Sequence, residues 1–248
     1  MGAIGEKIGG IVEGLILLLL GLYVGLFVTV GDYWRYMNPK FKWLTGTAGV
    51  VLILVGLMAT VRPNREARLF RVFVFLAFMS FAALPSFEPG ARINGPAREE
   101  PRLLLDGQEY IRINLGELTM VCDEAHPNQE TECYVLRGMV KRSRDLDRAG
   151  EFVVLRIAVF CCFADAVAMG FRVHYDRTAE LYDGQWVQVY GTLRRLSSEQ
   201  PSPSLPVRGA FFTMVSDCCV IMPTKVVDIE PPPIPYMFEF KKSEPHVY

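Results

Sequence analysis

Hydrophobic and polar residues divide this chain into two contrasting parts. The first third holds three long apolar segments, and two of them, residues 14–30 and 43–61, contain no charged side chain. Each is about long enough to cross the hydrocarbon core of a bilayer as a helix, at ~1.5 Å per residue. The third has an arginine near its start and a proline near its end, which a membrane helix tolerates at its ends. The pattern predicts a membrane anchor over residues 1–87, with three helices at about 8–30, 43–61 and 69–87.

Beyond the anchor, the composition changes to that of a linker and then of a β-rich domain. Residues 88–102 are rich in Pro, Gly, Arg and Glu, as linkers are. The apolar character resumes from Leu103 to Val121, which is typical of a short strand or a packing segment. Five further runs show alternation or β-rich composition between turn signals. They are residues 131–141, 152–163, 169–175, 185–193 and 210–222.

These runs predict the fold class, a membrane-anchored α plus all-β protein. Transmembrane helices are followed by a small OB-like Greek-key β-barrel of antiparallel strands over residues 103–248, which ends in a proline-rich tail. Gly138 and Gly191 lie inside two of the expected strands, where glycine permits the sharp bends of a small barrel. A β-sandwich is the alternative.

The charges bear on partners, activity and topology. The chain has 26 basic and 27 acidic side chains, so no positive field favours nucleic acid as a partner. The sequence has no glycine-rich phosphate loop, no C-x-x-C motif and only 3 histidines, so we expect no enzyme. Arginines are dense in residues 62–71, and placing that loop inside makes this a multi-pass protein of the cell (inner) membrane with an extracytoplasmic soluble domain.

One stretch resembles a known family. Residues 156–166, RIAVFCCFADA, are similar to the R-x-x-x-x-C-C-x-A-D-A signature of the YcgQ-type membrane proteins, an uncharacterised bacterial family. The W-V-x-V-x-G pattern at 186–191 and the proline-tyrosine ending at 232–236 fit the same resemblance. Members are typically encoded beside a multi-spanning permease. The resemblance therefore implies a non-enzymatic accessory subunit of a membrane permease, whose barrel binds substrate or partner at the membrane face.

The paired cysteines favour an alternative, a metal- or redox-handling membrane protein. Strand alternation places Cys161 and Cys218 toward the core. Their neighbours Cys162 and Cys219 then point away from it, so neither pair alone can chelate one metal. A site for zinc or another soft cation needs ligands from both pairs and a carboxylate. The candidate set is Cys161, Cys162, Asp165, Cys218 and Cys219. Buried thiols, disulfides and a turn-capping role for Asp165 are the other interpretations.

Two more cysteines, Cys122 and Cys133, enclose a polar loop. The simplest interpretation is a loop closed by a disulfide, which contributes about 2–4 kcal/mol to stability. The alternative is a metal loop in which Cys122, His126 and Cys133 are three ligands.

Three aromatic residues are candidates for contact with a partner or the membrane surface. Trp186 and Tyr190 lie on the expected outer face of their strand, and exposed aromatic surface is typical of interaction sites. Tyr236 belongs to the extended tail, which either docks on the barrel or reaches a partner.

Overall fold

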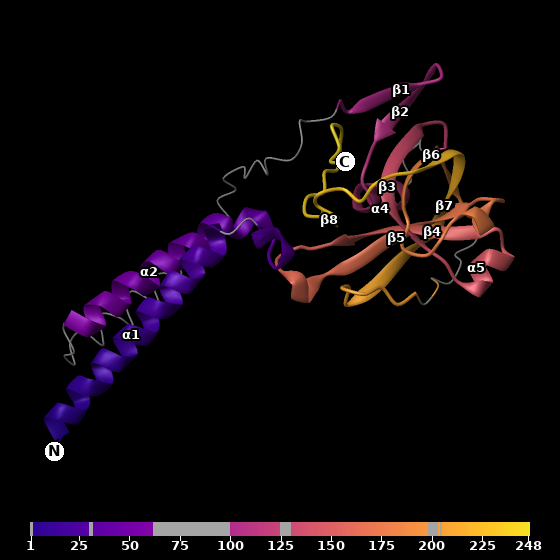
Figure 1. The fold of residues 1–248 in the computed structure, drawn as a ribbon. Coiled ribbons are helices and arrows are strands. Elements are labelled where there is room, and N and C mark those ends of the chain that lie inside the picture. Colours follow the sequence, from indigo (N-terminus) through magenta and orange to yellow (C-terminus); the bar gives the residue numbers. More distant parts are fainter. Residues whose placement is uncertain (1, 30–31, 62–99, 125–129, 198–202, 204) are drawn as a thin grey trace. The chain divides into compact units, whose positions relative to one another are not determined.

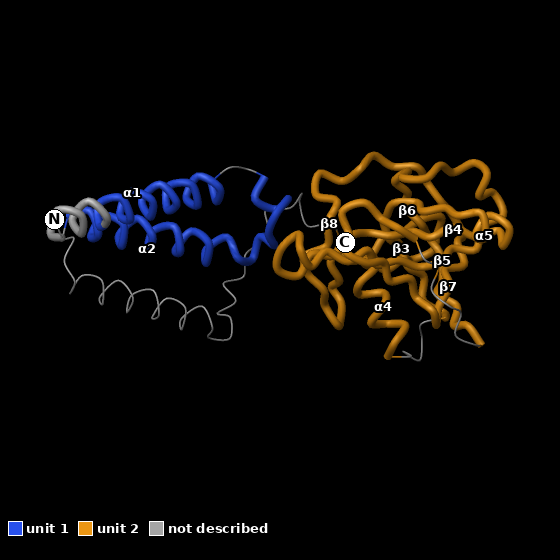
Figure 2. The backbone as a smooth tube through the Cα atoms, turned by 90° about the horizontal axis from the view of Figure 1, so that it is seen from below, with its two compact units in different colours: residues 1–93 blue, residues 94–248 orange. Residues whose placement is uncertain are grey.

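The computed structural model describes residues 2–29, 32–61, 100–124, 130–197, 203 and 205–248. The chain forms two compact units, residues 1–93 and 94–248, which are coloured separately in Figure 2. The predicted division into an anchor over residues 1–87, a linker and a domain from residue 103 stays a prediction.

The first unit contains two long apolar helices joined by two short turns. Among its described residues, the elements are α1 (Gly2–Thr29), η1 (Tyr33–Arg35), η2 (Pro39–Phe41) and α2 (Lys42–Val61). By length and composition alone, Gly10–Thr29 and Pro39–Val61 are apolar enough to cross a membrane. Two of the three predicted helices are thus confirmed as helices. The third, at 69–87, lies outside the described residues.

Glycines bring α1 and α2 into close contact, side by side (Figure 1). A Cβ atom on Gly21 would lie 2.8 Å from the carbonyl oxygen of Gly49, and one on Gly14 would lie 2.8 Å from that of Gly56. Small residues that let two backbones approach are typical of helix pairs in membranes. The outward faces carry large exposed apolar side chains, among them Ile16, Leu19, Leu22, Leu26, Leu54 and Leu57.

The second unit is built around a closed β-barrel. Its strands are β1 (Arg102–Leu105), β2 (Gln108–Arg112), β3 (Cys133–Lys141), β4 (Glu151–Ala158), β5 (Val167–His174), β6 (Trp186–Arg195), β7 (Phe212–Asp228) and β8 (Tyr236–Met237). The sheet order is β1-β2-β3-β6-β7-β5-β4-β8, and β4 also pairs with β3. That pairing closes β3, β6, β7, β5 and β4 into a barrel (Figure 1). Its helices are α4 (Leu115–Asp123), α5 (Arg144–Arg148), η3 (Phe163–Asp165) and η4 (Thr178–Glu180).

The five predicted runs correspond to the five barrel strands, so the prediction of a small closed barrel is confirmed and the β-sandwich is wrong. Two details differ. We expected antiparallel strands throughout, but β5 and β7 pair in parallel. β4 ends at Ala158, so Cys161 and Cys162 follow the strand instead of belonging to it.

One large core fills the barrel, and two smaller buried clusters lie apart from it. α4 contributes Leu115, Leu118 and Cys122 to the inner core. Outside the barrel, the β1–β2 hairpin joins the sheet edge at β3, and its Tyr110 packs edge-on against Tyr190 with ring centroids 5.2 Å apart. Tyr190 therefore lies on the outer side of its strand, as predicted, but the hairpin buries it there, so it is not an exposed aromatic side chain.

Gly191 marks a close approach between β6 and β7. A Cβ atom there would lie 2.3 Å from the carbonyl oxygen of Met222, beside a register shift between the two strands. We expect Gly191→Ala to lower the free energy of unfolding by about 2 kcal/mol, because backbone atoms must move to make room. Denaturant unfolding of the full chain in detergent measures this, and an unchanged midpoint would contradict it.

Candidate functional site

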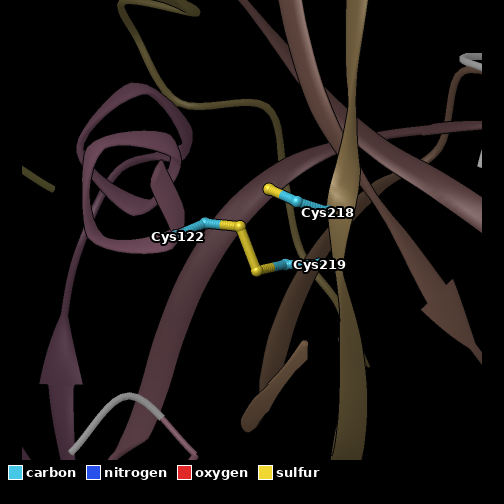
Figure 3. Close-up of side chains that lie close together, drawn as sticks. All are labelled: Cys122, Cys218 and Cys219. Atoms are coloured by element: carbon cyan, nitrogen blue, oxygen red, sulfur yellow. A yellow bond between two sulfur atoms is a disulfide. The ribbon is translucent and has the colours of Figure 1, made fainter. Parts of the chain in front are cut away.

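Three sulfur atoms meet where α4 contacts β7. Cys122 and Cys219 form a disulfide across 97 residues of sequence. The sulfur atoms of Cys122, Cys218 and Cys219 all lie within 4.8 Å of one another, and Figure 3 shows Cys218 pointing to the same side as the bonded pair. We call these three residues the sulfur centre.

The start of α4 is firmly fixed, and this places Cys122 in its last turn. The Asn114 side chain accepts a hydrogen bond from the Glu117 backbone N–H at 2.9 Å, and the Glu117 carboxylate accepts one from the Asn114 N–H at 3.4 Å. This reciprocal capping box satisfies two of the free N–H groups at a helix start. Leu115 and Leu118 then bury one face of α4, and Cys122 continues that face into the barrel core.

A bulge in β7 sets the orientation of the cysteine pair. Gly170 and Arg172 are two residues apart in β5, but their partners in β7 are five apart. Residues 216–219 thus lie opposite a single residue of β5, and this irregularity breaks the inward and outward alternation of the strand. Cys219 is consequently buried in the core, and Cys218 is only half-buried. The prediction that Cys219 points away from the core is wrong, whereas Cys218 packs against the same core from its edge.

Polar groups surround the sulfur centre. The Ser216 hydroxyl lies 3.5 Å from the Cys218 sulfur and 3.8 Å from that of Cys122. An Asp123 carboxylate oxygen lies 3.9 Å from the Cys218 sulfur. The Arg195 guanidinium donates to the Cys122 carbonyl oxygen at 3.1 Å. Thiolate and carboxylate groups are both ligand types that zinc accepts.

The sulfur centre corrects the predicted pairing of Cys122. Cys122 is bonded to Cys219 and not to Cys133, which is a free thiol at the start of β3. The physical reason is the direction of α4: its last turn faces the barrel core, whereas Cys133 packs with Tyr110 and Tyr190 outside it. His126, the third member of the alternative metal loop, lies outside the described residues.

A second sulfur pair lies in the loop after β4. Cys161 is exposed, Cys162 is half-buried, and their sulfur atoms are 3.5 Å apart. The prediction that Cys161 points into the core is wrong, because the strand ends before it. These two thiols do not belong to the group of ligand atoms gathered at the sulfur centre. The proposed five-residue ligand set is therefore divided between two places.

Asp165 holds the loop that carries this second pair. Its carboxylate accepts hydrogen bonds from the backbone N–H groups of Phe160 at 3.1 Å and Cys161 at 2.7 Å. The turn-capping interpretation of Asp165 is thus confirmed. The same carboxylate bonds the Cys161 thiol, and this contact, with the neighbouring Cys162, raises the pKa of Cys161 to about 12.

This pKa gives a testable result at Cys161. Asp165→Asn removes the negative charge that favours the protonated thiol, so we expect iodoacetamide to alkylate Cys161 about tenfold faster at pH 8. Peptide mass spectrometry after timed quenching gives the rate. Asp217→Asn, at an exposed acid in β7, is the matched control. Equal rates in wild type and Asp165→Asn would contradict the assignment.

The remaining aromatic candidates lie beside the tail. The Arg156 guanidinium carbon is 5.9 Å from the centroid of the Trp186 ring, and its nitrogen atoms donate to the carbonyl oxygens of Ile234, Pro235 and Tyr236. Trp186 and Tyr236 are both half-buried. The tail therefore docks on the barrel, and partner contact by these two residues stays a prediction.

Comparison with known proteins identifies the family. Residues 98–239 match the family model described as "DUF1980 C-terminal domain". The chain belongs to the DUF1980 family. That match covers the whole barrel, including the sulfur centre and the second cysteine pair. A comparison with curated proteins gave no match.

A comparison with solved structures found a chain described as "putative aspartyl-tRNA synthetase from Leishmania major Friedlin". It is 12% identical to this chain, with a TM-score of 0.27. The match covers 48% of this chain and 20% of that one. At this TM-score, the likeness supports no statement about the DUF1980 domain.

Two charged residues of this region were not among the predicted candidates. Glu117 is fully buried beside His246, with 3.5 Å between its carboxylate and the imidazole Nδ1. Its signal in the sequence is the N-x-x-E pattern before an apolar segment. Arg195 has no such local signal, because it reaches Cys122 only through the pairing of β6 with β7.

Proposed function

We propose that this chain is a membrane-anchored metal- and redox-handling protein whose sulfur centre binds one soft divalent cation of the zinc class when reduced. The observation that carries the proposal is the sulfur centre itself: three cysteine sulfur atoms within 4.8 Å, two of them joined. About 3.8 Å separates sulfur atoms that share one zinc at ~2.3 Å in tetrahedral geometry. Small side-chain movements would bring the reduced sulfur atoms to this spacing.

The proposed cycle balances in electrons and protons. A dithiol reductant of the thioredoxin class transfers two electrons to the Cys122–Cys219 bond and becomes a disulfide itself, leaving three thiols. The cation then displaces their protons, because thiolates are the ligands. Asp123 supplies a carboxylate near the exposed side, and Arg195 offsets part of the thiolate charge. A disulfide oxidant of the protein oxidase class then accepts two electrons from the Cys122 and Cys219 thiolates and becomes a dithiol. This step re-forms the bond, removes two ligands and releases the cation.

Counting zinc in two redox states tests this proposal. Full-length protein in detergent is treated with a phosphine reductant or left oxidised, equilibrated with zinc, and analysed for bound zinc. We expect reduction to add one zinc per chain. Cys218→Ser keeps the disulfide and should lose the added zinc, whereas Cys133→Ser should retain it. Equal zinc in the oxidised and reduced protein would refute the proposal.

A second candidate function is the accessory subunit of a membrane permease. It is supported by the resemblance described above and by the apolar outward faces of α1 and α2, which suit lipid or the helices of a larger membrane protein. A disulfide in the barrel also suits the extracytoplasmic placement. Purification in mild detergent should then yield a stoichiometric multi-spanning permease. Recovery of the protein alone, together with unchanged transport after its deletion, would contradict this function.

We also propose the OB-like assignment of the barrel. Its support is the cyclic order β3-β4-β5-β7-β6, in which β5 and β7 are the parallel neighbours. Nucleic acid is not proposed as a ligand, because the net charge of -1 gives no positive field.

A further inference from the structure

The loop after β4 holds two thiols close together. Cys161 and Cys162 are adjacent in sequence, yet their sulfur atoms lie only 3.5 Å apart. The Asp165 carboxylate fixes the loop by accepting two backbone N–H groups. The pair is therefore held in place before any ligand arrives, which lowers the entropic cost of binding.

We propose that Cys161 and Cys162 form a binding site for a soft, thiophilic cation, held as a two-sulfur chelate. Two sulfur atoms on one ion at ~2.3 Å are about 3.8 Å apart at the tetrahedral angle, close to the spacing in this loop. Thiolates select soft cations over magnesium or calcium. The ion displaces the thiol protons on binding, because thiolates are the ligands.

Two features make the bound ion exchangeable. Two sulfur ligands leave coordination positions open, whereas structural zinc sites are closed by four ligands. The surrounding surface is apolar: Phe211 is 84% exposed, and Phe160, Phe163 and Phe212 are exposed as well. The backbone N–H of Phe211 donates to the Ala166 carbonyl at 2.7 Å, which brings this aromatic segment beside the loop. Because Cys161 itself is exposed, an ion can reach the site from solvent.

The site is independent of the sulfur centre and can be tested while that centre is oxidised. Oxidised full-length protein in detergent is titrated with Cd²⁺, and sulfur-to-cadmium charge-transfer absorption is recorded. We expect one equivalent to bind, with the signal lost in Cys161→Ser and in Cys162→Ser. Cys133→Ser is the matched control that should keep it. Survival of the signal in Cys161→Ser, or its absence in wild type, would overturn the proposal.

An arsenical probe provides a second readout that needs no spectroscopic signal. Phenylarsine oxide bridges two neighbouring thiols, and peptide mass spectrometry should place it on the segment that contains both Cys161 and Cys162. The bridged protein should also lose its Cd²⁺ equivalent. An arsenical found on single cysteines only would contradict the chelate. Neither result depends on zinc uptake after reduction, so the failure of one proposal is distinguishable from that of the other.

Discussion

Replacing Glu117 with alanine is expected to lower the free energy of unfolding by about 3 kcal/mol or more. Glu117 is fully buried in α4. Its carboxylate accepts the backbone N–H groups of Lys241 at 2.7 Å and Val247 at 3.0 Å, besides that of Asn114. Truncation would leave these donors without the carboxylate, and each unsatisfied buried donor costs about 1–3 kcal/mol.

The same substitution should release the end of the chain from the barrel. Residues 241–247 bond directly to Glu117, so limited proteolysis should cleave this segment faster in Glu117→Ala than in wild type. Glu109→Ala is a suitable control, because Glu109 is exposed in β2 and its side chain bonds only Arg102 among the contacts described for it. An unchanged melting temperature with unchanged proteolysis would show that Glu117 does not hold the tail.

Glu117 should also make stability depend on pH. Burial raises its pKa to about 7, against the opposing effect of the backbone N–H donors. Between pH 4.5 and about pH 7, the folded state therefore keeps a proton on Glu117 that the unfolded state has lost. The stabilisation is complete below pH 4.5 and is lost as the pH rises through about 7. Burial lowers the pKa of His246. The contribution of His246 to stability is therefore present above about pH 6.5 and is lost as the pH falls.

A comparison with Glu117→Gln separates these opposing effects. Glutamine keeps the capping box but cannot ionise, and His246 remains in both proteins. We expect wild type to gain about 2 kcal/mol relative to Glu117→Gln between pH 8 and pH 5. Urea unfolding at several pH values measures the difference. Parallel stability curves would mean that Glu117 does not titrate in this range.

The sequence predicts the architecture well where the signal is local. Two of the apolar runs near the N-terminus and the five alternating runs each overlap an observed helix or strand, because burial on one face imposes its own period. The two glycines inside predicted strands also lie where backbones approach closely: a Cβ on Gly138 would be 2.9 Å from the Leu155 carbonyl. Local composition alone was sufficient for these assignments.

The cysteine chemistry was harder to predict because it depends on contacts between distant segments. The orientation of Cys218 and Cys219 follows from a bulge that exists only relative to β5. The partner of Cys122 is 97 residues away, whereas Cys133 was near in sequence and appeared a natural partner. Tyr190 is buried because a hairpin from before the barrel covers it. No pattern within a single strand contains this information.

Reducing the Cys122–Cys219 bond is expected to destabilise the barrel by about 4 kcal/mol. The bond closes a loop of 97 residues, and in the chain-entropy description longer loops give larger stabilisation. It also fastens α4 to β7, so the loss should affect the whole barrel and not a local segment. Unfolding with and without a phosphine reductant measures the effect, with Cys133→Ser as the control.

Zinc should recover much of this loss if the sulfur centre binds it. A ligand that binds only the folded protein stabilises it by about 4 kcal/mol at a thousand times its Kd, similar to the contribution of the disulfide. Cys218→Ser separates the two contributions: it should lose stability on reduction as wild type does, but zinc should not restore it. If zinc restored the stability of reduced Cys218→Ser, the metal would bind at a site other than the sulfur centre. Insensitivity of wild type to reduction would show that Cys122 and Cys219 are not bonded. The disulfide and the cation are therefore expected to be alternative ways of joining α4 to the barrel.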